Sequence, residues 1–321
     1  MNILKTTKCI ALVLMASVST ICAAEYPEKP ITFIVPFATG GIADLFARSI
    51  AQKVTEQTGK PIVVESKLGA GGRIGYAAGA KAAPDGYTFV ITDVTYTMLP
   101  ALYSKLPWDH ASLVPVSLIA QMPYIIAVNA DAKLPSLPHV IALAKANPGK
   151  MNFGSAGVGS VNQVVTAFFN QLAGIEMTHI PYRGMSEAMV GLLGGSVDLI
   201  ITAMPTAMAQ VRGGKVVAVG VSGPTRSAVL PNVPTASESG VPFVASIWIG
   251  LTAPKGTPQT ALDWMQKQVS IALSNPDVRQ QVAKVGAEAR PTTSEEFAKL
   301  FRDDTLRWGD VIRSAKIVAD E

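Results

Sequence analysis

The sequence predicts an α/β protein of two lobes, each built from strand–loop–helix units. Three observations indicate this fold. Short apolar runs alternate with amphipathic stretches from Ile31 onward, glycine-rich loops follow several of the runs, and the pattern begins again near Met151. The chain crosses to the second lobe near Ile125 and returns near Ser246. Two such crossings predict a hinge that lets the lobes close around a shared cleft.

The first 24 residues have the pattern of a secretory signal peptide. Lys5 and Lys8 begin it, a short apolar run follows, and small residues lead to Ala24. The apolar run is shorter than the ~20 residues that a membrane-spanning helix needs, so we expect export and cleavage after Ala24. Whether Cys22 carries a lipid is left open.

In the first lobe, predicted as residues 25–124 plus 246–321, we expect three units. Their strands are predicted at Ile31–Val35, Ile62–Glu65 and Thr88–Thr92, the second of them buried. Their loops are predicted at Phe37–Gly41, Gly69–Gly72 and Asp93–Thr97. The helix after the first loop has apolar residues at Ile42, Leu45, Phe46 and Ile50. Extended, proline-rich chain is expected from the third loop to Val116.

The second lobe, predicted as residues 125–245, is expected to contain a second set of strand–loop–helix units. Its strands are expected at Ile125–Val128, Met151–Phe153, Met177–Pro181, Asp198–Thr202 and Val216–Val221. Its helices are expected at Leu137–Ala146, Val161–Ala173 and Ser186–Leu193. Two further helices, Gln259–Leu273 and Ser294 to about Ser314, have no strands between them, so we assign them to the first lobe.

Composition argues against several kinds of function. Both cysteines, Cys9 and Cys22, lie in the signal segment, which leaves no disulfide, thiol nucleophile or thiolate metal site after cleavage. The segment also holds two lysines, so the net charge falls from +4 to +2, and no basic block occurs. We therefore expect no nucleic-acid partner. The three histidines, His110, His139 and His179, are far apart, and we expect neither a metal nor a cofactor.

Three glycine-rich loops occur at Thr39–Gly41, Gly71–Gly75 and Ser155–Ser160, and the first and the third carry hydroxyl groups. A helix N-terminus has N–H groups without helical partners and a partial positive charge, and glycines let an anion approach them. Any one loop is equally consistent with an ordinary turn. Three of them at the carboxyl ends of strands favour a site for a small anion.

No arrangement of residues predicts catalysis. Ser155 lacks the spacing of a hydrolase nucleophile because Phe153 replaces the upstream glycine, and Ile74 replaces the last glycine of a dinucleotide loop. Asp44 lies in the first turn of its helix, where we expect it to complement the helix dipole or bond internally. Arg183 is equally consistent with a charge at the cleft and a solvated surface residue. Tyr182 and Trp248 are expected more in the core than in the cleft.

Several motifs occur in one order from Tyr26 to about Ile317. They include YPEKPITFIVPFATGGIADLFAR, GAGGRIG, PDGYT, LPALYSKLPWDH, GSAGVGS, HIPYRG, LLGGSVDL and LPNVPTASESGVP. In this order they resemble the Bug-type receptors of tripartite tricarboxylate transporters. The resemblance implies a class II periplasmic-binding-protein fold, whose two lobes close on a small dicarboxylate, tricarboxylate or aromatic carboxylate. It also implies a location in the periplasm and transporter membrane subunits as partners. The sequence does not reveal the oligomeric state, but we expect a receptor that shuttles its ligand to be a monomer.

The resemblance also implies site residues. In the first lobe they are Phe37, Thr39, Gly40, Gly41, Asp44, Asp93 and Thr95, and in the second lobe Ser155, Gly157, Gly159, Ser160, Tyr182, Arg183 and Thr202. Two departures affect specificity: Thr202-Ala203 replaces an acid–amide pair, and Gln163 replaces a histidine. With no carboxylate at Thr202, we expect a ligand without an amine, and Phe37, Met185 and Met204 suit an apolar or aromatic acid. A sensor-associated binding protein and a secreted hydrolase are the alternatives.

Overall fold

The computed structural model describes residues 26–319. The predicted signal peptide, its cleavage site and the question of Cys22 lie outside the described residues. Within them the strands follow the order β2-β1-β3-β9-β4-β7-β5-β6, and β8 and β10 also pair with β4. The strands are β1 (Ile31–Val35), β2 (Ile62–Ser66), β3 (Thr88–Asp93), β4 (Leu113–Asn129), β5 (Asn152–Ser155), β6 (Thr178–Pro181), β7 (Leu199–Ala203), β8 (Val216–Val221), β9 (Ser246–Pro254) and β10 (Glu288–Ala289).

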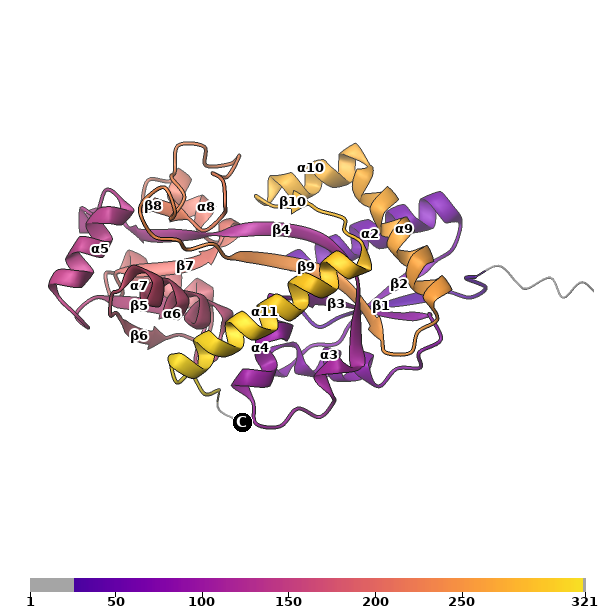
Figure 1. Cartoon of the computed structure of the whole chain (residues 1–321). Coiled ribbons are helices and arrows are strands. Elements are labelled where there is room, and N and C mark those ends of the chain that lie inside the picture. The colour runs from indigo at the N-terminus through magenta and orange to yellow at the C-terminus, as the bar shows by residue number, and fades with distance from the viewer. Residues whose placement is uncertain (1–25, 320–321) are drawn as a thin grey trace, which may run out of the picture.

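Helices cover both sides of these strands (Figure 1). They are α2 (Ile42–Thr58), α3 (Arg73–Ala80), α4 (Val94–Leu102), α5 (Leu137–Ala146), α6 (Val161–Ala173), α7 (Met185–Leu193), α8 (Met204–Arg212), α9 (Gln259–Ser274), α10 (Pro276–Lys284) and α11 (Ser294–Ser314). We call lobe 1 the group β1–β3 with α2–α4, α9 and α10. Lobe 2 is β5–β8 with α5–α8. The elements β4, β9 and α11 run along both lobes, as Figure 1 shows.

The register of the strands shows that the two lobes face each other. β3 runs parallel to β1 and ends with Asp93 opposite Ile249 of β9, which in turn lies opposite Ala120 of β4. β7 runs the other way along β4 and ends with Ala203 opposite Tyr124. Four residues of a strand span about 13 Å. The carboxyl ends of the parallel strands therefore point toward each other across a short stretch of β4.

The hydrophobic core has three parts, and one of them extends through both lobes. One part packs β1 and β3 against α2 and α9, and another packs β7 against α7 and α8. The third includes Tyr76 and Leu99 of lobe 1, Trp248 and Trp308 of the spanning elements and Phe169 of lobe 2. Its continuity joins the lobes on the side that α11 covers.

The third unit of lobe 1 differs from the prediction. Residues 93–97 do not form a loop, because Asp93 ends β3 and caps α4, accepting a hydrogen bond from the Thr95 N–H at 3.0 Å. The helix buries Met98, Leu99 and Leu102 and tolerates Pro100 in its last turn. The cap and the buried apolar side chains stabilise a helix where polar sequence indicated a loop.

Two expectations about burial were wrong. β2 is not buried: it lies at the edge of the sheet with β1 as its neighbour, and Val63 is 48% exposed. Leu45 does not join the buried face of α2, because its side chain is 51% exposed. An edge strand has one face and one side in contact with water, and apolar composition alone does not reveal that position.

The other differences concern strand length and missed helices. The segment expected as extended chain to Val116 instead contains the rest of α4, a 3₁₀ turn at His110–Ser112 and the start of β4, and the strand expected at Ile125–Val128 is the end of that same strand. The sequence reading did not include α8 or α10, each of which begins with proline in its first turn. The crossings expected near Ile125 and Ser246 fall on β4 and β9, and the exact lobe boundaries stay a prediction.

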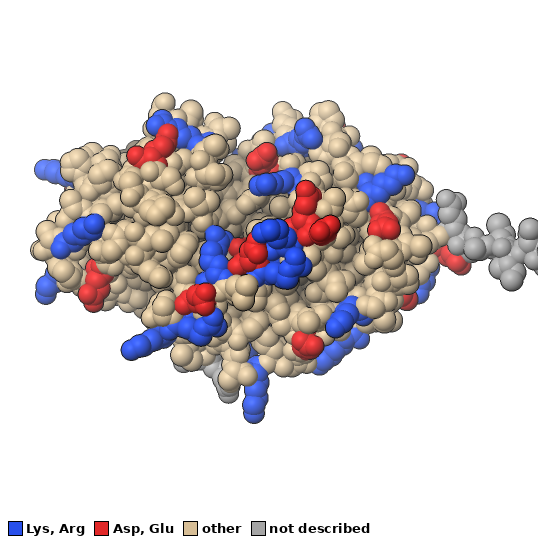
Figure 2. All heavy atoms as spheres, viewed as in Figure 1, with Lys and Arg blue, Asp and Glu red and all other residues tan. Residues whose placement is uncertain are grey.

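Charged residues are scattered over the surface. Figure 2 shows lysine and arginine interspersed with aspartate and glutamate on the face that α11 crosses, with no region of one sign. Among residues 26–319, none of the helices is long and apolar enough to cross a membrane.

Candidate functional site

The loop between β1 and α2 carries the first group of predicted site residues. Gly40 has a φ of +81°, and its N–H donates to the Asp44 carboxylate at 2.9 Å. Gly41 precedes α2 without a side-chain cap, and the Thr39 hydroxyl lies 3.2 Å from the hydroxyl of Ser66. The half-buried Phe37 packs its ring edge to face against Tyr76. The loop is therefore shaped by its own side chains.

Asp44 acts inside this loop, as the sequence indicated. Its side chain is buried, and both carboxylate oxygens lie 3.0 Å from the Arg48 Nε. Burial by itself would raise the pKa of Asp44, but the Arg48 guanidinium and the Gly40 N–H lower it below its usual value. Asp44 is thus an ionised anchor for the loop, and a direct contact with ligand stays a prediction.

At the end of β3, Asp93 stands between the cap of α4 and an aromatic cluster. Its Oδ1 accepts hydrogen bonds from the Tyr76 hydroxyl at 3.1 Å and from the Thr95 N–H. Burial raises the pKa of the Asp93 carboxyl to about 6, although these bonds act in the opposite direction. The carboxyl therefore titrates close to neutral pH at the edge of lobe 1 that faces lobe 2.

The loop between β5 and α6 carries the second group. The Ser155 hydroxyl, which is fully buried, donates to the Gly157 carbonyl at 3.0 Å and accepts from the Gly157 N–H at 3.1 Å. Ser160 caps α6 through the Gln163 N–H at 3.4 Å. Gly157 and Gly159 have φ values of +119° and +74°, which only glycine adopts without strain. The serine hydroxyls shape this loop too.

Hydroxyl groups were expected to grip the ligand, yet those of Ser155 and Ser160 already bond within the protein. What the loops leave unpaired are backbone donors. In the part of the chain that the structure describes, the N–H groups of Ala38 and Thr39 in lobe 1 and of Ala156 and Val158 in lobe 2 have no protein partner. Each lobe thus offers amide donors in the loop after a parallel strand.

Four helices that begin at this edge also leave backbone donors free. The helices α2, α3, α7 and α8 begin without a side-chain cap, as α5 and α9 do elsewhere, whereas α10 and α11 have one. α4 and α6, which also begin here, are capped by Asp93 and Ser160. An uncapped helix start leaves N–H groups and the positive end of the dipole available to an anion.

The remaining predicted residues, in β7 and in the loop after β6, differ in exposure. Thr202 is buried in β7, and the Tyr182 ring lies against Gly191 of α7, where an added Cβ would meet its hydroxyl oxygen at 2.2 Å. Arg183 is exposed, and its backbone N–H points to Glu187 at 3.3 Å. Whether these three contact ligand stays a prediction.

Two side chains considered for the cleft belong to the core. Met204, expected to suit an apolar acid, is fully buried beside the position of Gly286, so its side chain is not available at the surface. Trp248 is also fully buried, as the sequence favoured. Its Nε1 donates to Asp304 of α11 at 2.7 Å.

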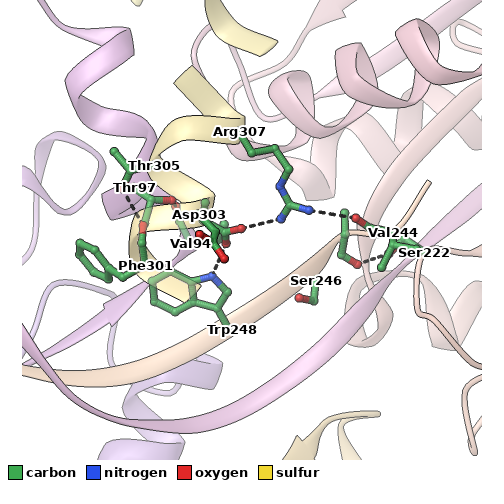
Figure 3. A network of polar contacts seen from close by, with 12 residues as sticks. Val94, Thr97, Ser222, Val244, Ser246, Trp248, Phe301, Asp303, Thr305 and Arg307 are labelled. Carbon is green, nitrogen blue, oxygen red and sulfur yellow. Dashed lines mark hydrogen bonds and ion pairs between the residues drawn. The ribbon is translucent and has the colours of Figure 1, made fainter. Parts of the chain in front are cut away.

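The contact between Trp248 and Asp304 belongs to a network at the hinge. Figure 3 labels Trp248, Arg307 and Val244 of this network. Arg307 of α11 donates to Asp304 at 2.6 Å and to the Val244 carbonyl, just before β9, at 3.1 Å. Its guanidinium also lies 4.4 Å from the Trp308 ring centre. α11 is therefore fixed both to β9 and to the lobe 2 segment that leads into it.

One surface hollow of the described residues lies elsewhere. It measures about 430 Å³ on the outer side of lobe 2, between α5 and the end of α6, and includes Ile141, Leu172 and Val241. None of the predicted site residues lines it. The loops after β1, β3 and β5 form a more polar, more convergent arrangement, so we take them as the candidate site.

Sequence reasoning missed three residues that shape the candidate site: Tyr76, Gln163 as a bonding partner, and His179. Tyr76 lies on α3 and reaches Asp93, and His179 on β6 reaches Ser155. The signal for His179 was its place in a strand next to the one that carries Ser155. The prediction treated it as an isolated histidine.

The two facing lobes define a class of protein, the solute-binding proteins. The solved periplasmic binding protein BugD matches with a TM-score of 0.75 and 31% identity, covering 92% of this chain and 100% of that one. MatC from Rhodopseudomonas palustris, solved with bound malate, matches with a TM-score of 0.74 and 32% identity over 89% of this chain and all of MatC. An R. palustris protein solved with adipate has a TM-score of 0.79 and 28% identity, covering 92% of this chain and 99% of that one.

Sequence comparison gives the family. The model described as tripartite tricarboxylate transporter family receptor matches residues 46–317, and the chain belongs to this family. Among curated relatives, protein BugT of Bordetella pertussis is 36% identical over 300 residues, which cover 91% of each chain. The family resemblance and the mixed α/β fold predicted from the sequence are confirmed.

Proposed function

We propose that this protein is a periplasmic receptor that binds a small organic carboxylate between its lobes and delivers it to the membrane subunits of a tripartite tricarboxylate-type transporter. One observation carries the proposal: each lobe presents unpaired backbone N–H groups in a glycine-rich loop. The two loops follow β1 and β5, which run parallel to β3 and β7 and so point toward each other. Neutral amides bind a carboxylate without leaving a buried charge unpaired when the site is empty.

The ligand class follows from the residues at the edge of the site. Thr202 provides no carboxylate for an ammonium group, and the Asp93 carboxyl already accepts bonds from Tyr76 and Thr95. Phe37 adds an apolar surface on the lobe 1 side. These features favour organic acids without an amine. The family and its solved members with malate and adipate support the same class.

A binding screen tests this proposal. The mature chain is heated with adipate, malate, citrate, terephthalate, aspartate or glutamate, and positive results are measured by calorimetry. A ligand that binds only the folded chain adds about 2.7 kcal/mol of stability at a hundredfold excess over Kd. We expect at least one of the four acids that lack an amine to raise Tm. Binding of none of the six, or of aspartate and glutamate only, would contradict the proposal.

Two glycine variants localise the binding. Gly159→Ala places a Cβ 2.8 Å from the Ala319 Cβ at a φ of +74°, so it distorts the lobe 2 loop. Gly174→Ala is the control, because Gly174 has a φ of +61° at the far end of α6 with no atom near the added Cβ. Affinity is expected to fall in the first variant alone. Equal affinities in both variants would place the ligand elsewhere.

Export and partnership need separate measurements. Osmotic-shock release of the protein with a new N-terminus at Glu25 would support the periplasmic location and the predicted cleavage. Ligand-dependent cross-linking to the membrane subunits would support delivery to a transporter. Retention in the cytoplasm with an intact Met1 would contradict the first of these.

A further inference from the structure

The loop between β5 and α6 is held by a chain of hydrogen bonds that passes through one histidine. The Gly159 N–H donates to the Gln163 Oε1 at 2.7 Å, and the Gln163 Nε2 lies 3.1 Å from the His179 Nδ1. The His179 Nε2 lies 2.6 Å from the Ser155 hydroxyl, which bonds to both polar backbone groups of Gly157. His179 therefore connects the two glycines on which the loop turns.

These bonds fix where the imidazole proton is. The Gln163 Oε1 accepts from a backbone N–H, so its amide NH₂ must be the group that faces His179. The Nδ1 then accepts and carries no proton, and the Nε2 carries the proton and donates to Ser155. Ser155 already donates its hydroxyl proton to the Gly157 carbonyl, so its oxygen can only accept a hydrogen bond from His179. His179 therefore does not act as a base toward Ser155. The pair is arranged to hold the loop, and not to activate a nucleophile.

His179 is placed to remain neutral. Its ring stacks on Phe153 with centroids 5.0 Å apart, and burial lowers the pKa of His179. The elements around it, β5, β6 and α6, contain no charged residue. The charged residues that flank these elements, Lys150, Glu176 and Arg183, are exposed. Asp198 comes just before β7, at the end of this strand away from the candidate site, and its carboxylate accepts a hydrogen bond from the Asn152 N–H.

We propose that His179 is a positioning residue whose neutral imidazole holds the Gly157–Gly159 loop in its ligand-binding form, so that protonation of His179 weakens carboxylate binding. This inference rests on the proposed function. A second proton on the Nδ1 would face the Gln163 NH₂, and two donors cannot bond to each other. Turning the Gln163 amide removes the acceptor of the Gly159 N–H. Either outcome releases one end of the loop.

The first measurement needs no ligand. In protein with ¹⁵N-labelled histidine, nitrogen shifts report the tautomer and the pKa of each ring. We expect the His179 proton on Nε2 and a pKa below the usual 6.5. A proton on Nδ1, or a pKa at or above 6.5, would overturn the proposal. The exposed His139 serves as the internal reference.

The second measurement is the pH profile of Kd, taken between pH 5 and 7.5 with the acid from the screen, beginning with adipate. His179→Gln keeps a donor for Ser155 but does not titrate, and His139→Gln is the matched control. Wild type and the control are expected to lose about tenfold more affinity at acid pH than His179→Gln, which corresponds to one pKa unit. The ratio of the wild-type Kd to the variant Kd at each pH cancels the effects of titrating the ligand and Asp93, which both proteins share.

A third variant separates positioning from simple folding. His179→Phe removes both bonds, so we expect weak binding at every pH with a retained thermal transition, whereas His179→Gln should bind nearly normally at pH 7.5. Identical pH profiles in wild type and His179→Gln would overturn the inference while leaving the receptor function intact. If no acid binds, the proposed function fails, and the tautomer measurement still decides how the loop is held.

Discussion

Asp93 shows how one side chain combines structural and electrostatic roles. It caps α4, accepts the Tyr76 hydroxyl and lies at the edge of lobe 1 that faces lobe 2. Its raised pKa means that the folded chain binds a proton more tightly than the unfolded chain does. Asp93 therefore costs stability as it ionises, and that cost grows as the pH rises from about 4 to above 6.

Asp93→Asn tests this cost. Asparagine keeps the cap on α4 and cannot ionise, so the variant is expected to gain stability relative to wild type as the pH rises from 4 to 7. Since the side chain is partly exposed, the gain should be about 1–3 kcal/mol. Urea denaturation at several pH values gives the difference, in which other titrating groups cancel. A constant difference, or one that falls with pH, would contradict the raised pKa.

At the same scale, sequence patterns identified the residue types of the candidate site but not their contacts. Glycine spacing located the loops after β1 and β5, because positive φ angles require glycine. The bonds of His179 to Ser155 and Gln163 join residues that are 24 and 16 positions apart. Periodicity contains no information about such pairs, so His179 was treated as isolated.

Among the elements, α11 has the clearest role in joining the lobes. Its first half packs Phe297 and Phe301 around Trp248, and its second half packs Trp308 against Phe168 of α6. The capping box at Thr293 and Glu296 fixes where it begins. A helix that contacts both lobes beside β4 and β9 limits how the hinge can bend.

Asp304→Ala is expected to destabilise the protein by about 2–4 kcal/mol, because it leaves the Trp248 Nε1 buried without an acceptor and Arg307 without its carboxylate. Chemical denaturation measures the change. The neighbouring Asp303→Ala is the matched control. Asp303 pairs with Lys299 at the surface, where substitutions usually change stability by less than about 0.5 kcal/mol. Similar losses in both variants would show that the network has no special role.

Element prediction worked best where local signals were complete. The helices Leu137–Ala146 and Val161–Ala173 have the predicted bounds, since each has a serine before it and an Asn or Gly after it. α4 and α8 were missed because a proline lies within each and their apolar stretches are short. Burial against other elements stabilises them, and the sequence of a nine-residue helix does not reveal that contribution.

For the whole molecule, the main consequence of the fold is a core shared by both lobes. Trp308 and Phe169 belong to one continuous cluster with Tyr76 and Trp108. Lobes that share a core should not unfold independently. All four tryptophans lie outside residues 125–245, so their fluorescence reports mainly on lobe 1 and the spanning elements, although Trp308 also contacts Phe168 of lobe 2.

Phe169→Ala tests this coupling. Phe169 is fully buried in lobe 2 against Phe243, and removing its ring should cost about 3–5 kcal/mol. We expect tryptophan fluorescence and circular dichroism to shift together to lower denaturant in one transition. Val190→Ala, at a 69% exposed position of α7, should leave both curves nearly unchanged. A fluorescence transition that stays in place while circular dichroism splits would show that the lobes unfold separately.

The sequence by itself determined the strand–loop–helix units, the glycine loops, the absence of cysteine after Cys22 and the family. Each of these depends on neighbours within a few positions or on residue type. Only the tertiary structure decided that β2 is an edge strand, that Met204 lies in the core, that β4 and β9 run through both lobes, and that His179 holds the loop. These features arise from contacts between segments far apart in the chain, and their free energy depends on burial and hydrogen bonding that exist only after folding.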